Sequence, residues 1–119
     1  MREIKAVIRP NKLPALREAL REVAGFPGMT VCKVEGLSSL SRLSPGKASL
    51  KSELTDYTAK IRIEIVAPDE LADHIVDVIV AGAGTGQIGD GLVWVTPVER
   101  SVFVHKTMPG AEAVKDYPT

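Results

Sequence analysis

Two stretches in which apolar and polar residues alternate, each followed by a stretch of helical period, constrain the fold of this chain most. In the first, EIKAVIR at 3–9, Ile4, Ala6 and Ile8 fall on one face, which predicts a strand. The next stretch, LPALREALREVA at 13–24, spaces its leucines for one face of an amphipathic helix. The start of the chain therefore predicts a strand followed by a helix.

The same unit occurs a second time. AKIRIEIVAP at 59–68 alternates and predicts a strand, and 69–83 has the apolar spacing of a helix, with Asp69 as its N-cap. Shorter stretches, MTVCKVE at 29–35 and LVWV at 92–95, predict the strand that closes each unit. The order βαβ, loop, βαβ predicts an α+β, ferredoxin-like βαββαβ sandwich, in which two helices cover one face of an antiparallel four-stranded sheet.

The segments between and after these units have no sustained period. The serine-rich stretch 37–58 predicts one long loop, and loops of about 20 residues inside a compact domain tend to be functional. SVFV at 101–104 predicts an extra short C-terminal strand, and 106–119 predicts a polar tail. Because the length suits one core, the whole chain, 1–119, is expected to form a single domain.

Composition argues against several classes of function. Fifteen basic and fifteen acidic side chains cancel, and few aromatic residues are present to stack on RNA bases, so nucleic acid is not an expected partner. No apolar stretch reaches the roughly 20 residues that span a bilayer, and the start of the chain lacks the apolar core of a signal peptide, so a cytoplasmic protein is expected. The sequence shows no group of side chains with the spacing of a catalytic site, so we do not expect an enzyme.

Cys32 is the only cysteine, which excludes an intramolecular disulfide and a four-cysteine zinc site within one chain. We expect it to be a small core residue rather than a reactive thiol. The two histidines, His74 and His105, are too scattered to form a metal site with it in one chain. No metal is therefore predicted.

The stretch TGQIGDGLVWV at 85–95 places three glycines and an acid in front of an apolar run. Taken alone, GDG at 89–91 is a weak signal, because it is equally explained as a tight turn into a strand.

Three stretches together resemble the PII signal-transduction family: EIKAVIRPNKLPALREALREV at the start, GMTVCKVEG at the second strand, and KIRIEIVAPDELADHIVDVIVAGAGTGQIGDGLVWVTPVE in the second half. The family signature is Thr or Ser, three residues, Gly-Asp-Gly, a basic residue and an apolar run. Thr85, 89–91 and 93–95 fit it, whereas Leu92 stands in the place of the basic residue.

The resemblance implies a homotrimer that binds an adenine nucleotide in each cleft between subunits, where the bare amides of the Gly-Asp-Gly turn approach the phosphates. It also implies that 37–58 is the T-loop, which orders on binding and docks on a target transporter or enzyme. The cleft is then expected to be lined by Val7, Met29, Thr30, Gly36, Leu37, Ser38, Lys60, Arg62, Glu64, Val66, Gly89, Asp90, Gly91, Leu92, Arg100, Phe103 and His105.

The chain departs from the family at the phosphate end of that cleft. Phe103 and His105 stand where the family has phosphate-binding arginines, and Leu92 replaces a further cation. Because hydrogen bonds to charged groups contribute roughly 1.5 to 3 kcal/mol each, the site is expected to favour ADP or AMP over ATP.

The T-loop departs as well. It lacks the tyrosine that the family uridylylates, and Ser38, Ser39 and Leu40 replace a Gly-Arg-Gln run that serves magnesium and 2-oxoglutarate. The chain therefore resembles a divergent PII-like branch, linked to bicarbonate uptake and carboxysomes, with an anion held by Ser38, Ser39 and Ser41. The alternatives are a nitrogen-regulatory PII that senses ATP and 2-oxoglutarate, and a metal-linked, CutA-like trimer.

Overall fold

The alternating stretches form a four-stranded antiparallel sheet in the computed structural model, which describes residues 1–37 and 57–107. The strand order is β2-β3-β1-β4, with the two most regularly alternating strands in the centre. The strands are β1 (Arg2–Ile8), β2 (Thr30–Leu37), β3 (Tyr57–Ala67) and β4 (Gly91–Pro97). This sheet, with its two helices, confirms the predicted ferredoxin-like α+β fold.

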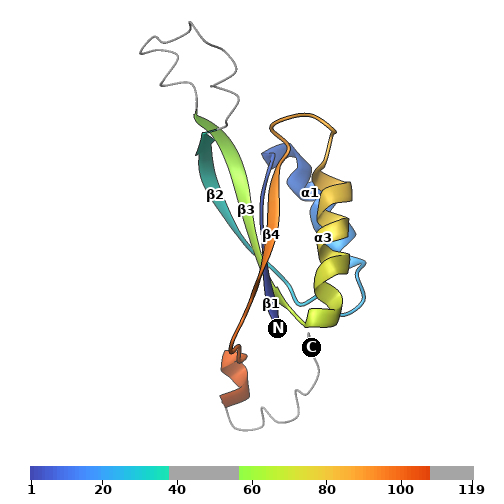
Figure 1. Ribbon diagram of the computed structural model, residues 1–119, viewed down its shortest axis with the longest axis vertical. Helices are drawn as coiled ribbons and strands as arrows, with labels where there is room; N and C mark the ends of the chain where they lie inside the picture. The colour runs from blue at the N-terminus through green and yellow to red at the C-terminus, as the bar shows by residue number, and fades with distance from the viewer. Residues whose placement is uncertain (38–56, 108–119) are drawn as a thin grey trace, which may run out of the picture.

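Both helices lie on the same side of the sheet and contact each other (Figure 1). A short 3-10 helix, η1 (Pro10–Lys12), leads into α1 (Leu13–Arg21), with Pro14 in the first turn of α1, where a missing N–H costs nothing. The longer helix is α3 (Asp69–Ala83). None of the described helices is long and apolar enough to cross a membrane.

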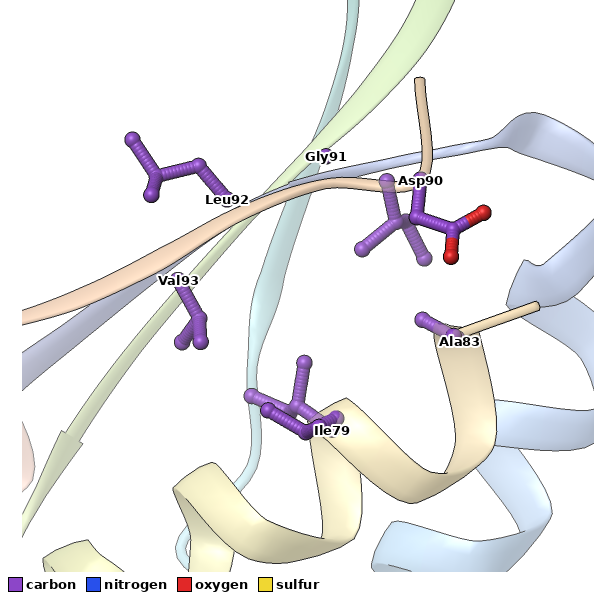
Figure 2. Close-up of a pocket in the computed structure, with 9 residues that line it drawn as sticks. Ile79, Ala83, Asp90, Gly91, Leu92 and Val93 are labelled. Atoms are coloured by element: carbon purple, nitrogen blue, oxygen red, sulfur yellow. The ribbon is translucent and has the colours of Figure 1, made fainter. Parts of the chain in front are cut away.

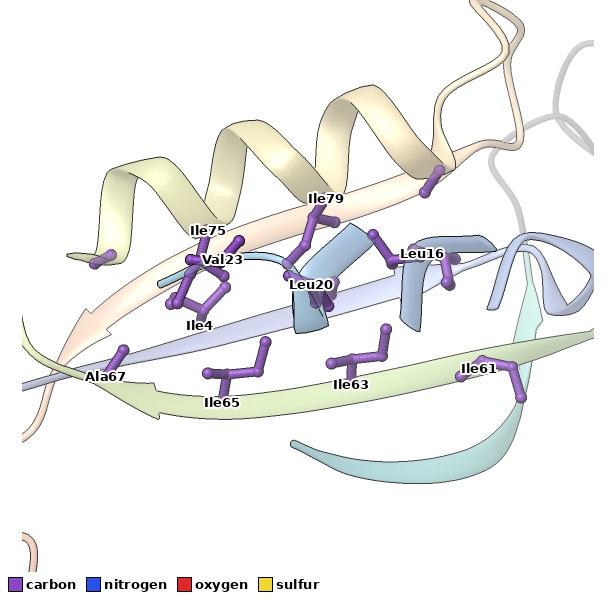
Figure 3. Packing of buried hydrophobic residues seen from close by; sticks show 14 residues of the cluster. Ile4, Leu16, Leu20, Val23, Ile61, Ile63, Ile65, Ala67, Ile75 and Ile79 are labelled. Carbon is purple, nitrogen blue, oxygen red and sulfur yellow. The ribbon is translucent and has the colours of Figure 1, made fainter. Parts of the chain in front are cut away.

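The core is the layer between the helices and the sheet (Figure 3). The alternating apolar residues of β1 and β3 point into it and meet the apolar faces of α1 and α3. Its fully buried large side chains are Ile4, Leu16, Leu20, Ile63, Ile65, Ile75 and Ile79. The period of these four elements therefore predicted which of their faces is buried.

The opposite face of the sheet, which we call the open face, has no helix over it in the described residues. The register places Val7 beside Arg62 on one side and Leu92 on the other, and Lys5 beside Trp94. Leu92 is 66% exposed and Trp94 37% exposed. The open face thus carries a mixture of charged and large apolar side chains.

Cys32 lies on this open face, so the prediction that it is a core residue is wrong. β2 pairs with β3 so that Cys32 is opposite Arg62, whereas Val31 is opposite the buried Ile63. Its side chain is only half-buried, and its Sγ lies 3.6 Å from Nη2 of Arg62 and 4.0 Å from Oε1 of Glu64. An apolar residue in a strand joins the core only on the covered face.

The predicted strand at 101–104 does not form. The chain leaves β4 at Pro97, continues without regular structure, and ends its described part in a 3-10 helix, η3 (Val104–Thr107), beyond the far end of β4 (Figure 1). A strand needs a neighbouring backbone for its hydrogen bonds, and this segment pairs with none of the four described strands. A short run of β-branched and aromatic residues is therefore not enough to predict a strand.

The boundaries of the predicted T-loop also shift. Leu37 pairs with Tyr57 and Gly36 with Thr58, so the ends assigned to the loop at 37 and 58 belong to β2 and β3. The hydroxyl of Thr58 donates to the carbonyl of Gly36 at 3.4 Å, which supports this last pairing. The rest of the loop, 38–56, and the tail beyond 107 lie outside the described residues.

Asp69 is the first residue of α3 and not its N-cap, so that prediction is wrong. Pro68 holds the cap position in an extended conformation, and no side chain caps the helix. The carboxylate of Asp69 instead lies 2.8 Å from the amino group of Met1 and 3.8 Å from Nε of Arg2. The carboxylate of Asp69 therefore pairs with the two cations at residues 1 and 2 and does not cap the helix.

Candidate functional site

The segment 84–91, which we call the glycine loop, joins α3 to β4 and is folded around one carboxylate. Oδ2 of Asp90 accepts three backbone N–H groups, those of Thr85 at 2.6 Å, Gly86 at 2.9 Å and Gln87 at 3.3 Å. Oδ1 accepts the hydroxyl of Thr85 at 2.5 Å. Both carboxylate oxygens are thus occupied by donors of the loop, and Asp90 acts first as its internal brace.

Arg9, directly after β1, fastens this loop to the sheet. Its Nε donates to Oδ1 of Asp90 at 3.1 Å, and its Nη2 donates to the carbonyl of Ile88 at 3.2 Å. Hydrogen bonds from Thr85, and then the one from Arg9, hold the pKa of Asp90 well below its ordinary value, because they stabilise the ionised carboxylate.

The role of Arg9 was not predicted from the sequence. In the sequence this residue is only the last polar residue of an alternating stretch, and its partner lies 81 positions away. A single sequence carries no signal for that contact.

Two glycines of the loop have backbone conformations that other residues avoid. Gly91 has φ +117°, and a Cβ there would overlap the carbonyl oxygen of Val7 on β1. Gly89 has φ +101°, and its Cβ would lie 3.1 Å from Nη2 of Arg9. Glycine at 91 is therefore required by the packing of β4 against β1, whether or not a ligand binds.

Lys60 reaches the glycine loop from β3. Its Nζ donates to the carbonyl of Gly89 at 2.6 Å, and the side chain is partly buried. The loop is thus held by two cations that lie far apart in the sequence, Arg9 just after β1 and Lys60 on β3. This places a positively charged group beside glycine backbone, which is the chemistry that suits an anion.

A cleft of about 640 Å³ lies between the glycine loop and the open face. This volume falls in the usual range of small-molecule sites, about 300 to 1,000 Å³. It is lined by Val7, Gly36, Leu37, Lys60, Gln87, Ile88, Gly89, Asp90, Gly91, Leu92 and Trp94. The ends of β1 and β2, the first half of β3, the glycine loop and the start of β4 therefore contribute to one site.

The structure brings about half of the sequence-predicted cleft residues together. Those that line the cleft are Val7, Gly36, Leu37, Lys60, Gly89, Asp90, Gly91 and Leu92. Those that do not line it within this chain are Met29, Thr30, Arg62, Glu64, Val66, Arg100, Phe103 and His105. Ser38, Ser39 and Ser41 lie outside the described residues. Gln87, Ile88 and Trp94 line the cleft although they were not predicted to do so.

Five of the predicted residues outside the cleft lie either on the open face or in the segment beyond β4. Arg62 and Glu64 lie on the open face, 3.7 Å apart between Nε and Oε1, where each balances the charge of the other. Phe103 and His105 contact each other through their rings, with centroids 5.2 Å apart, in the segment beyond β4. Arg100 is exposed in the same segment.

A second, smaller pocket of about 150 Å³ lies on the helix side of β4 (Figure 2). Figure 2 shows Leu92 and Val93 on opposite sides of β4, with Val93 directed toward Ile79 of α3. The wall of this pocket is largely aliphatic, and Asp90, Gly91 and Leu92 border both this pocket and the cleft. In the described part of the chain, no three His, Cys, Asp or Glu side chains gather as a metal site would require.

Comparison with known proteins gives a consistent result over nearly the whole chain. Residues 1–108 match the profile of the family described as Nitrogen regulatory protein P-II. The chain is 42% identical over 107 residues to Nitrogen regulatory protein P-II 1 of Escherichia coli K12, which covers 87% of this chain and 91% of that protein. It is 34% identical over 117 residues to Nitrogen regulatory protein P-II of Haemophilus influenzae, covering 96% and 100%.

Proposed function

Because the chain belongs to the family of nitrogen regulatory proteins P-II, we propose that it binds an adenine nucleotide in the cleft beside the glycine loop and signals the bound nucleotide to a target protein. Proteins of this family are regulatory signal transducers rather than enzymes. The proposal places the protein in the cytoplasm and assigns target docking to the loop at 38–56, which lies outside the described residues.

The observation that carries the proposal is the cleft itself. It combines backbone of the glycine loop, one amine from Lys60, and a wall of apolar side chains, within a volume that accepts a nucleotide. Phosphates are commonly bound by glycine-rich backbone with a nearby lysine, and the base of a nucleotide suits the apolar wall.

We further propose that the protein is a homotrimer that closes this cleft with a second copy. Two features support this: the open face carries large apolar side chains exposed to solvent, and eight of the expected contact residues do not line the cleft formed by one chain. Exposed apolar surface of this kind marks contact surfaces. Light scattering coupled to size exclusion should give the mass of three chains, and the mass of one chain would contradict the proposal.

The cleft is proposed to favour ADP or AMP over ATP. Lys60 is the one cation among the described residues that line it, and its amine is already bonded to Gly89. Arg9 lies next to the cleft but is paired with Asp90. Few charges are therefore available to balance a third phosphate.

Replacing Leu92 by lysine tests this preference. Leu92 lines the cleft and is 66% exposed, so an amine at this position has room to reach the phosphates. We expect Leu92→Lys to increase the affinity for ATP about tenfold and to change the affinity for AMP less. A charge-assisted hydrogen bond in an exposed cleft contributes a free energy at the lower end of the usual range. Isothermal titration calorimetry with both nucleotides measures this.

Leu92→Met is the matched control, since it keeps an apolar side chain of similar size and should leave both affinities unchanged. An unchanged ratio of ATP to AMP affinity in Leu92→Lys would show that position 92 does not face the phosphates.

Two small molecules, bicarbonate and 2-oxoglutarate, are candidates for a second ligand that binds together with the nucleotide. Bicarbonate is proposed because the Gly-Arg-Gln run of the T-loop is replaced here, with Ser38, Ser39 and Ser41 as donors, although these serines lie outside the described residues. The second candidate, nitrogen regulation with ATP and 2-oxoglutarate, is favoured by the names of the relatives, which are nitrogen regulatory proteins.

One calorimetric experiment separates the two candidates. The purified protein is titrated with ATP, ADP and AMP, each alone, with bicarbonate, and with magnesium and 2-oxoglutarate. ADP or AMP binding that tightens with bicarbonate supports the carbon-linked function. ATP binding that tightens with 2-oxoglutarate supports nitrogen regulation, and no heat with any nucleotide contradicts the proposed function as a whole.

A further inference from the structure

The cleft gathers four large apolar side chains that remain substantially exposed. Leu37 is 55% exposed, Ile88 67%, Leu92 66% and Trp94 37%. They come from the end of β2, the glycine loop and β4, so the fold and not one local run of sequence collects them. A concentration of exposed apolar side chains around one cleft indicates that something apolar covers them.

The polar groups of the same cleft are largely committed to one another. The amine of Lys60 donates to the carbonyl of Gly89 at 2.6 Å, and Asp90 is paired with Arg9 at 3.1 Å. No other Lys or Arg is found among the cleft residues that the structure describes. The attraction that these described residues offer to each additional phosphate is therefore small, whereas the apolar side chains of the wall remain exposed.

Trp94 is the aromatic part of that wall. It lies on the open face of β4, two positions after Leu92, and Leu92 is directly opposite Val7 on β1. Side chains two apart on one strand and opposite on the next strand are neighbours on the same face. Trp94, Leu92 and Val7 therefore form one continuous apolar floor beside the glycine loop.

We propose that Trp94 is the residue on which the base of the ligand stacks, and that the cleft recognises the nucleoside part of the ligand rather than its number of phosphates. This inference rests on the proposed function, because it states which part of the nucleotide the cleft recognises. An aromatic base is the occupant that fits, because it is flat, matches the indole face, and leaves its sugar and first phosphate toward Lys60 and the glycine loop.

The chain offers a direct probe, since Trp94 is its single tryptophan. Indole fluorescence of the full-length protein therefore reports on this position alone. Titration with adenosine, AMP and ADP is expected to change the fluorescence in the same way for all three ligands. The three dissociation constants are expected to lie within about tenfold of one another, because only the nucleoside part contributes strongly.

Substitutions then separate stacking from general loss of structure. Measured by calorimetry, Trp94→Leu should lower the affinity for AMP at least about fivefold. This is the lower end of what base stacking on an aromatic side chain contributes. Trp94→Phe keeps a ring and should restore most of that affinity. Thr96→Val is the matched control, since Thr96 lies on the same face of β4 outside the cleft, and it should bind AMP as the wild type does.

The outcomes distinguish this inference from the function on which it rests. Absence of heat with every nucleotide in the wild type overturns both. AMP binding with equal affinity in wild type and Trp94→Leu overturns the stacking role alone. Affinity that rises about tenfold with each phosphate from adenosine to ADP overturns recognition through the nucleoside, and leaves the nucleotide function in place.

Discussion

Replacing Gly91 by alanine is expected to lower the thermal unfolding midpoint by at least about 10 °C at fixed protein concentration. The new Cβ would overlap the carbonyl oxygen of Val7, and φ at this position is +117°. Overpacking against backbone and an unfavourable φ each contribute roughly 1 to 3 kcal/mol. Because Gly91 pairs with Ile8 at the start of β4, relief of the overlap must disturb the β1–β4 ladder. Differential scanning calorimetry measures the effect.

Gly86→Ala is the matched control for this experiment. Gly86 also has a positive φ, +82°, but no atom lies within 4 Å of the place where its Cβ would be. Only the cost of the backbone conformation applies, about 1 kcal/mol, so its midpoint should fall by a few degrees. If the two variants unfold within about 3 °C of each other, the proposed overlap at Gly91 is not what requires glycine.

Replacing Asp90 by asparagine is expected to loosen the glycine loop and to lower the affinity for AMP by about tenfold or more. Part of the binding free energy must then be used to order the loop. An amide has only one acceptor oxygen. If its nitrogen takes the place of Oδ2, the three backbone N–H groups of the loop lose their acceptor, and if it takes the place of Oδ1, the bond from Arg9 is lost. Calorimetry with AMP measures this loss.

The effect of Asp90→Asn on stability is also expected to depend on pH. The pKa of Asp90 is lowered in the folded protein, so below about pH 4 the unfolded chain binds the proton more readily than the folded one. The stability that this carboxylate contributes is present above about pH 4 and is lost as the pH falls further. The difference in unfolding midpoint between wild type and Asp90→Asn should therefore narrow from pH 7 to pH 3.

Thr96→Val, which replaces no ionisable group, is the control, and its offset in unfolding midpoint from wild type should stay constant over the same range. A constant offset for Asp90→Asn as well would mean that the loop does not depend on the ionised carboxylate.

Much of the fold followed from local patterns. Ile4, Ala6 and Ile8 alternate and are buried, and Ile61, Ile63 and Ile65 do the same on β3. Period and burial agree here because a sheet covered on one face buries alternate residues. Local sequence was misleading at 101–104, where β-branched and aromatic residues predicted a strand but none of the four described strands pairs with this segment.

The candidate site could be predicted from the sequence less completely than the fold. The Gly-Asp-Gly turn was visible as a motif, but its role in the structure was not: Asp90 braces the loop, and Gly91 leaves room for the carbonyl of Val7. Trp94 joined the cleft only through the register of β4 against β1. These roles depend on contacts between residues that are distant in the chain, which local patterns do not encode.

By itself, the sequence determined the order of the four strands and two helices, the buried face of β1, β3, α1 and α3, and the family to which the chain belongs, because periodicity and motif spacing are local properties. Only the tertiary structure decided that Arg9 and Lys60 hold the glycine loop, that Cys32 lies on the open face, and that four exposed apolar side chains meet around one cleft. Those features arise where the four strands are brought side by side, and strand pairing sets them residue by residue.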